Sequence, residues 1–175
     1  MSHATMAIVI RPAESDDIPA IIAFIKAARA VMFPMLDKES HDQQAELELS
    51  KFQKTYLDHP HGAFLTARVN NQLIATIGYL PYDDQFPELD LGRQGIVEIV
   101  RLYVDPAWRR AGLASKLVAV AEQTAKNAGI QQIYLHTHPF LDGAVTFWEQ
   151  QGFSVLQVDD DPLWRTTHMK KLISI

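Results

Sequence analysis

The sequence predicts an α/β fold in which helices cover a mixed β-sheet, and three local patterns carry that prediction. Residues 97–104 are rich in β-branched and aliphatic side chains on both faces, as in a central strand covered on both sides. From Leu113 onward the apolar residues recur with helical spacing, and Gly129 suits the left-handed position past a helix end. Asn70 and Asn71 join two further apolar runs and predict a hairpin.

The other elements are placed by the same signals along the chain. A helix is expected from about Ile18 to Ala30, because Ser15 to Asp17 can cap its start and Pro19 fits its first turn. We expect further strands at 8–10, 62–69, 72–80, 131–136, 154–158 and 166–172, and helices at about 41–57 and 142–151. Residues 31–36 are expected to break the chain between two helices, and residues 81–95 to form an acidic loop.

Composition limits the classes of function. The 175 residues fit one domain, 1–175, with enough length for a substantial core. The absence of cysteine excludes disulfides and thiolate nucleophiles. A net charge of −5, from 16 basic and 21 acidic residues, argues against a nucleic-acid partner and weakly favours a cationic or amine substrate. No apolar run approaches the roughly 20 residues that span a bilayer, so we expect a cytoplasmic protein without a membrane partner.

A short basic turn, Arg109 to Ala114, lies between the central strand and the following helix. Unpaired amides and partial positive charge at a helix start hold phosphate readily, and two arginines add charged donors. Gly112 and Ala114 are small enough for a phosphate to reach the backbone. The turn is therefore a candidate anion site, with a solvated turn as the alternative.

Three stretches resemble the GCN5-related N-acetyltransferase (GNAT) superfamily. Arg109-x-x-Gly112-x-Ala114 fits the family signature Q/R-x-x-G-x-G/A and follows an L-x-V strand at 102–104. Ala144-x-x-Phe147-Trp148-Glu149-x-x-Gly152-Phe153 resembles A-x-x-F/L-Y-E-x-x-G-F, and residues 8–13 resemble the first strand of the family. The resemblance implies a mostly antiparallel sheet flanked by helices on both faces. It also implies transfer of an acetyl group from acetyl-coenzyme A directly to a primary amine in a ternary complex.

The resemblance further assigns residues to the coenzyme. Amides of the turn would hold the pyrophosphate, and the backbone of Leu102 and Val104 would pair with the pantetheine arm. The implied coenzyme-binding residues are Leu102, Tyr103, Val104, Arg109, Arg110, Ala111, Gly112, Leu113, Ala114, Ser115 and Trp148. The apolar residues 31–36 fill a gap in the core or, as in relatives, border the acceptor pocket.

Glu98 is the candidate general base, because an amine must lose a proton before its nitrogen attacks. Strand alternation predicts that Glu98 shares a face with Val100, Leu102 and Val104, among apolar side chains. Its spacing to the turn resembles that of the catalytic glutamate in the histone-acetylating branch. The alternative is a structural ion pair with Arg101, although alternation places Arg101 on the opposite face.

The proton donor to the departing thiolate is left open. Many relatives use the tyrosine of the F-Y-E block, but this chain has Trp148, and indole does not release a proton at neutral pH. Either Tyr103, Tyr134, His138 or water supplies the proton, or the step proceeds without a donor. A family asparagine is also replaced, by Leu141. His136 and His138 have a spacing that can share a metal, but no third ligand is evident and no metal site is predicted.

The predicted function is therefore an N-acetyltransferase with a small-molecule amine slightly favoured over a peptide amine. The alternative is a noncatalytic acyl-coenzyme A-binding sensor, for which the replacement at Trp148 is the reason. A nucleotide-binding domain is disfavoured because the turn lacks both phosphate-loop glycine patterns. A homodimer is possible by resemblance, with 166–172 expected as an exposed edge strand that mediates it.

Overall fold

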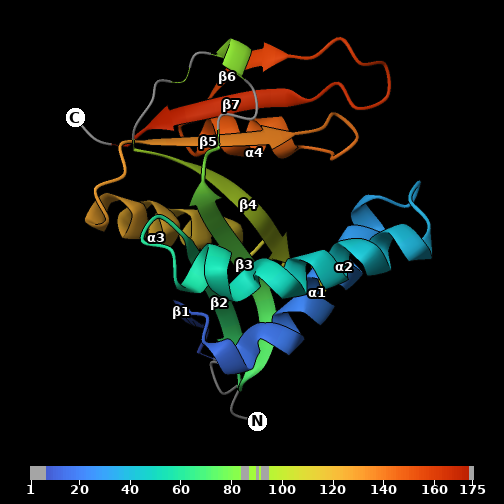
Figure 1. The fold of residues 1–175 in the computed structure, drawn as a ribbon, viewed down its shortest axis with the longest axis vertical. Helices are drawn as coiled ribbons and strands as arrows, with labels where there is room; N and C mark the ends of the chain where they lie inside the picture. The colour runs from blue at the N-terminus through green and yellow to red at the C-terminus, as the bar shows by residue number, and fades with distance from the viewer. Residues whose placement is uncertain (1–6, 84–86, 90, 92–94, 174–175) are drawn as a thin grey trace.

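A computed structural model describes residues 7–83, 87–89, 91 and 95–173. In that part of the chain seven strands form one sheet, in the order β1-β2-β3-β4-β5-β7-β6 (Figure 1). Every neighbouring pair is antiparallel except β4 and β5. The strands are β1 (Val9–Pro12), β2 (Ala63–Val69), β3 (Gln72–Pro81), β4 (Ile96–Val104), β5 (Gln132–Thr137), β6 (Ser154–Val158) and β7 (Thr167–Leu172).

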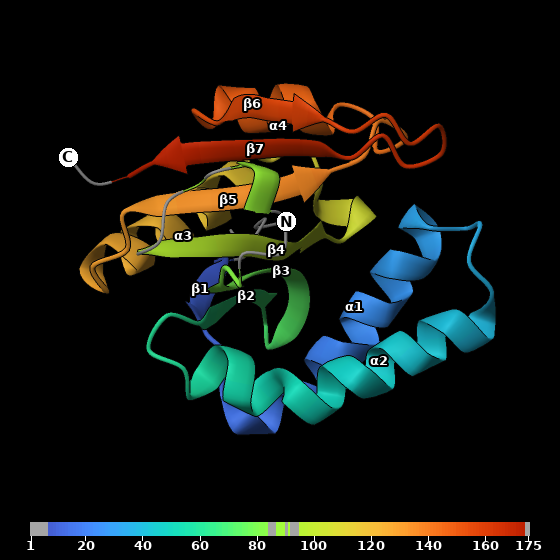
Figure 2. The same ribbon diagram turned by 45° about the horizontal axis from the view of Figure 1, so that its top comes forward.

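Helices cover both faces of this sheet, as predicted. Helices α1 (Ile18–Met32) and α2 (Lys38–Phe52) lie together on one side (Figure 2). Helices α3 (Leu113–Asn127) and α4 (Ala144–Gln150) contribute their buried residues to a separate cluster with the other face. A π-helical turn, Gln53–Leu57, extends α2, and 3-10 turns span Ser15–Asp17, Pro87–Leu89 and Pro106–Trp108. Within the described residues no helix has the length and apolar character needed to cross a membrane.

Most predicted elements are confirmed, with shifted ends. Helix α1 continues to Met32, so the expected break between the first two helices is shorter than residues 31–36. Helix α2 begins at Lys38 rather than near His41, because the Asp37 carboxylate accepts the Ser40 amide at 2.8 Å and caps the helix. The hairpin turn is confirmed, since Asn70 and Asn71 have φ of 49° and 66°.

The expected edge strand is wrong. Strand β7 lies between β5 and β6 and pairs with both, so β6 is the strand at the edge of the sheet. The sequence order of the last two strands hid this arrangement, because β6 forms its pairs only with the strand that follows it. The predicted acidic loop at 81–95 falls partly outside the described residues, including Asp84 and Asp90.

Strand β4 contains a bulge that reverses its alternation. Val100 is paired with Gly78 and Tyr103 with Thr76, so Arg101 and Leu102 together face a single residue of β3. Arg101 has φ of 58°, and its carbonyl accepts the Thr76 hydroxyl at 2.8 Å. Glu98 therefore shares a face with Val100, as predicted. The prediction is wrong for Leu102 and Val104, which lie on the opposite face of β4.

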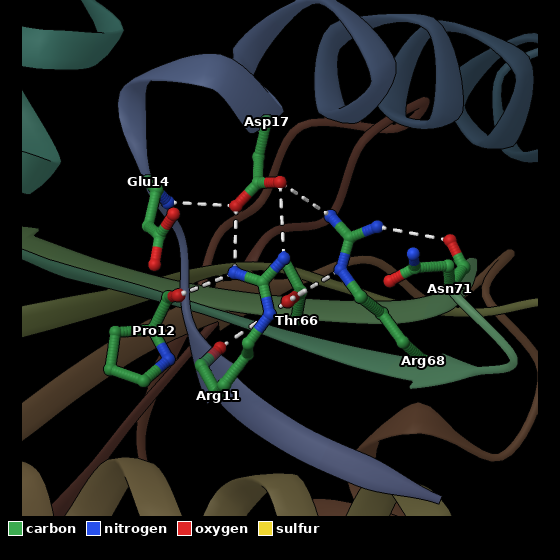
Figure 3. A network of polar contacts seen from close by, with 7 residues as sticks. All are labelled: Arg11, Pro12, Glu14, Asp17, Thr66, Arg68 and Asn71. Carbon is green, nitrogen blue, oxygen red and sulfur yellow. Dashed lines mark hydrogen bonds and ion pairs between the residues drawn. The ribbon is translucent and has the colours of Figure 1, made fainter.

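The start of α1 is fixed to the sheet by a network of charges (Figure 3). The Asp17 carboxylate accepts Arg11 Nη1 at 2.8 Å and the Glu14 amide at 2.8 Å, and pairs with Arg68 Nη2 at 3.2 Å. The hydrogen bond from Arg11 is the main reason that the pKa of Asp17 lies below its usual value. Because Arg11 lies on β1 and Arg68 on β2, the network orients the helix that forms one wall of the site.

Candidate active site

The site begins where the two central strands separate. Strand β4 pairs with β5 only from Ile96 to Glu98, after which β4 continues beside β3 alone and β5 beside β7. The bulge at Arg101 lies just past the last of these pairs. The sheet therefore opens between β4 and β5, and two connected cavities lie at the opening.

The larger cavity is a cleft of about 610 Å³ that runs between α1, β4 and the starts of α3 and α4. Its lining is mainly apolar and comprises Phe24, Ala27, Ala28, Val31, Met32, Leu102, Tyr103, Val104, Asp105, Pro106, Arg109, Ala114, Leu141, Asp142, Gly143, Ala144 and Phe147. Five of the predicted coenzyme residues are in this set, and α1 is the wall that sequence reasoning missed. The helical spacing of the apolar residues within 24–31 was the sequence signal for this wall, but a helix that packs on the core shows the same spacing.

The predicted anion turn borders the cleft. Gly112 has φ of 74°, and a Cβ built there would meet no atom within 4 Å. The first bond of the helix ladder runs from the Lys116 amide to the Gly112 carbonyl at 3.1 Å, so the preceding amides of α3 lack a ladder partner. The Arg109 Nε donates to the Val104 carbonyl at 3.3 Å and joins the turn to β4.

The other predicted residues of the turn differ in exposure. Arg110 and Ala111 are exposed, Leu113 is buried in the core, and Ser115 is exposed with its hydroxyl accepting Gln151 Nε2 at 3.1 Å. Arg110 has φ of 68°, another left-handed residue two positions before Gly112. The turn therefore presents small residues, open amides and two arginines to one solvent-accessible space.

The second cavity, of about 350 Å³, adjoins the first. It is lined by Arg29, Met32, Phe33, Leu80, Glu98, Ile99, Val100, Arg101, Leu102, Tyr103, Leu135, His136, Thr137, His138, Leu141 and Trp148. Four residues, Met32, Leu102, Tyr103 and Leu141, line both cavities. A group in the cleft and a second molecule in this cavity would meet at these four residues.

Glu98 lies in the wall of the second cavity and has a partner that sequence reasoning missed. Its side chain is 9% exposed, and its Oε2 lies 3.2 Å from His136 Nδ1. The His136 side chain is 34% exposed and so connects the carboxylate to solvent. Arg101 instead forms a two-bond ion pair with Glu48 of α2, so the predicted alternative of a Glu98–Arg101 pair is wrong.

His138 lines the same cavity from the end of β5 and belongs to an aromatic cluster. Its ring stacks on Phe140, with centroids 5.2 Å apart, and touches Trp164 and Phe33. Its Nδ1 lies 3.2 Å from the Trp164 carbonyl, which can only accept, so Nδ1 carries a proton. Burial lowers the pKa of His138, which favours the neutral ring.

Of the three predicted catalytic residues Glu98, Tyr134 and His138, Tyr134 is the one that lines neither cavity. It is fully buried, and its hydroxyl lies 2.6 Å from His168 Nδ1. His168 Nε2 in turn lies 3.1 Å from Asp159 Oδ1. By contrast Tyr103, 8% exposed, lines both cavities.

Trp148 is both a core residue and a wall of the second cavity. It is 7% exposed, and its ring packs edge-on against Phe147 and Phe153 at centroid distances of 5.0 and 5.2 Å. The packing alternative for this position therefore has direct contacts in its support. Among the described residues no group of three or more side chains could hold a metal ion.

The chain is similar in sequence to known acetyltransferases. The model of the acetyltransferase (GNAT) family matches residues 26–153. N-acetyltransferase 8 of Homo sapiens is 29% identical over 106 residues, which cover 61% of this chain but only 44% of that protein. N-acetyltransferase YjgM of Escherichia coli K12 is 28% identical over 145 residues, covering 83% of this chain and 81% of that protein.

Solved structures share the whole architecture. A GNAT-family acetyltransferase from Staphylococcus aureus Mu50 has a TM-score of 0.75 at 22% identity, covering 96% of this chain and 100% of the other. PaiA N-acetyltransferase from Thermoplasma acidophilum, solved in complex with coenzyme A, has a TM-score of 0.74 at 20% identity, covering 95% and 99%. At these identities the likeness shows the fold, and it confirms the predicted fold class.

Proposed function

Because the chain belongs to the acetyltransferase (GNAT) family, we propose that it transfers an acetyl group from acetyl-coenzyme A to a primary amine. The observation that carries the proposal is the pair of cavities that meet at Met32, Leu102, Tyr103 and Leu141. Such a pair lets an amine and a thioester approach in one ternary complex without an enzyme-bound intermediate. The chain matches less than half the length of N-acetyltransferase 8. The substrates of the present chain are therefore proposed and are not taken from that relative.

The cleft fits acetyl-coenzyme A, which supplies the acetyl thioester when bound. The pyrophosphate would be held by the α3 amides beside Gly112, where nothing fills the space over the backbone, and by Arg109 and Arg110. Among the described residues no strand pairs with β4 on its β5 side past Glu98, so its backbone there can pair with an extended ligand. The apolar side chains of α1 would cover the opposite side of the cleft.

Glu98 would act as the general base. It would take one proton from the ammonium group, after which the freed nitrogen would form a C–N bond at the thioester carbon as the C–S bond breaks. The nitrogen would lose its second proton to the proton donor or to water, and the leaving sulfur would gain one, which gives the thiol. His136 carries the proton from Glu98 to solvent, since it touches the carboxylate and is one-third exposed. The overall products are the N-acetylated amine and the coenzyme thiol.

Tyr103 is the best-placed proton donor for the thiolate. It lines both cavities, whereas the Tyr134 hydroxyl is bonded to His168 outside them. His138 lines the second cavity, which would hold the amine and is called the acceptor cavity. The lowered pKa of His138 disfavours the charged ring that would donate most readily. Water remains the alternative donor. The cytoplasmic location and the homodimer stay predictions.

Thiol release tests the proposal. We expect purified protein with acetyl-coenzyme A to release thiol with at least one class in a panel of amines, amino acids and short peptides. The variant Glu98→Gln should lower kcat about 100-fold or more and leave coenzyme affinity nearly unchanged, because general bases typically contribute 10²–10⁴-fold. The matched control is Glu46→Gln, which makes the same change on the exposed surface of α2.

Two results would contradict the proposal. Tight coenzyme binding with no thiol release from any amine would favour the noncatalytic sensor. Equal kcat for Glu98→Gln and Glu46→Gln at every pH would remove Glu98 as the base and leave the transferase reaction standing.

A further inference from the structure

Among the residues that the structure describes, one cation in the wall of the acceptor cavity has no carboxylate partner. Arg29 extends from α1, and its Nε is buried without a hydrogen-bond partner. Across the part of the chain that the structure describes, no carboxylate pairs with it. Its guanidinium carbon lies 4.8 Å from the centre of the Phe33 ring, which holds the charge in place but supplies no negative partner.

The other arginine of the cavity wall already has an anion. Arg101 is neutralised by Glu48 through two hydrogen bonds, and Glu98 Oε2 lies 3.2 Å from His136 Nδ1. His138 favours its neutral form, as burial lowers its pKa. A cationic acceptor would thus meet Arg29 as a repulsive charge, even though the whole chain has a net charge of −5.

We propose that the acceptor is an amino acid: an amine that also carries a carboxylate, with Arg29 binding the carboxylate while Glu98 takes the proton from the ammonium group. This inference rests on the proposed acetyl transfer and names its acceptor class. A guanidinium matches a carboxylate in shape and can bind it through two parallel hydrogen bonds. Arg29 lines the acceptor cavity but not the coenzyme cleft, so this charge is available to the acceptor.

The rest of the lining defines the body of the acceptor. Besides Arg29 and Glu98, the lining includes the apolar side chains of Met32, Phe33, Leu80, Leu141 and Trp148. A volume of about 350 Å³ suits a small molecule. The acceptor is therefore an amino acid with an apolar side chain or an apolar spacer, rather than a polyamine.

Matched acceptors with and without the carboxylate test the inference. We would measure kcat/KM for L-phenylalanine against phenethylamine, and for 6-aminohexanoate against hexylamine, in wild type, Arg29→Met and Arg29→Lys. The control Lys26→Met removes a charge from the same helix, at a residue that lines neither cavity. Calorimetry with each acceptor on coenzyme-loaded protein provides a readout that does not need turnover.

We expect wild type to prefer the amino acid of at least one pair by tenfold or more. Arg29→Met should lower kcat/KM for that amino acid by about 10- to 100-fold, because a charge-assisted hydrogen bond contributes about 1.5–3 kcal/mol. Carboxyl-free amines should change less than twofold, Arg29→Lys should retain part of the preference, and Lys26→Met should match wild type.

Turnover of the carboxyl-free amines at rates equal to the amino acids would overturn the inference and leave the acetyl transfer intact. An equal loss for both members of each pair in Arg29→Met would also overturn it. If amino acids bind in an Arg29-dependent way but no thiol is released, the carboxylate site stands and the proposed function fails. If neither binding nor release is seen, both fail.

Discussion

Replacing Gly112 by aspartate tests the coenzyme turn most directly. The position has φ of 74°, and a new Cβ would meet nothing within 4 Å, so the fold has room for a side chain. Gly112→Asn is the matched control, because asparagine has nearly the same shape, tolerates the left-handed conformation equally well and carries no charge. Both variants should lose about 1 kcal/mol of stability from backbone strain.

The charge alone should separate the two variants in coenzyme affinity. A carboxylate about 6 Å from a pyrophosphate that carries two negative charges is repelled by about 3 kcal/mol at an effective dielectric constant of about 40. That energy corresponds to roughly 100-fold in Kd. Raising the ionic strength to about 1 M should shrink the difference, because the screening length falls to about 3 Å.

Isothermal titration calorimetry with coenzyme A provides the measurement, and thermal denaturation checks that both variants are folded. Dissociation constants of both variants equal to that of wild type would refute the assignment of the pyrophosphate to this turn. Weakening of both to the same degree would refute the predicted charge repulsion and show that the glycine matters for shape alone.

Three further predictions concern the charges around the site. Asp17→Asn should lower the melting temperature by about 4–8 °C, from a loss of about 2 kcal/mol. Folding lowers the pKa of Asp17, so its contribution to the free energy of unfolding is present above the usual pKa near 4. That contribution should vanish as the pH falls through the folded-state pKa, so the difference between wild type and Asp17→Asn in denaturation should be smaller at pH 3 than at pH 7. Glu48→Gln should cost about 3 kcal/mol in chemical denaturation because it leaves Arg101 buried and unpaired, and adding Arg101→Met should recover part of that loss. Burial in the folded state lowers the pKa of His138, so protonation of this ring as the pH falls favours the unfolded chain. Wild type should therefore lose more stability than His138→Gln between pH 7.5 and 5.5, and equal losses would contradict the burial of His138 as the cause of the lowered pKa.

The sequence predicted best those features that depend on neighbours along the chain. The turn at Gly112 and the hairpin at Asn70 and Asn71 could be recognised because each needs a left-handed backbone that few residues adopt readily. The helices α1 and α3 followed from apolar spacing. For the same reason the ends shifted where a cap such as Asp37, rather than the apolar pattern, decided where a helix starts.

The acceptor cavity could not be assembled from the sequence, because its partners are far apart in the chain. Arg101 is paired with Glu48, 53 positions earlier, and Glu98 with His136 across the sheet. Nothing in a local pattern distinguishes Arg29 from a solvated helix residue. Its role depends on β4 and β5 separating beside α1, which is a property of the folded sheet.

The bulge at Arg101 links the shape of the sheet to the chemistry of the site. A regular strand would place Glu98 on the same face as Leu102 and Val104, which line the coenzyme cleft. With one extra residue the alternation reverses after Val100, so the proposed base and the cleft-lining Leu102 and Val104 lie on opposite faces of β4. A left-handed, non-glycine residue costs about 1–3 kcal/mol, and the bidentate contact with Glu48 offsets that strain. We therefore assign Arg101 a shaping role, and Arg29 remains the cation of this cavity that is free to bind an acceptor.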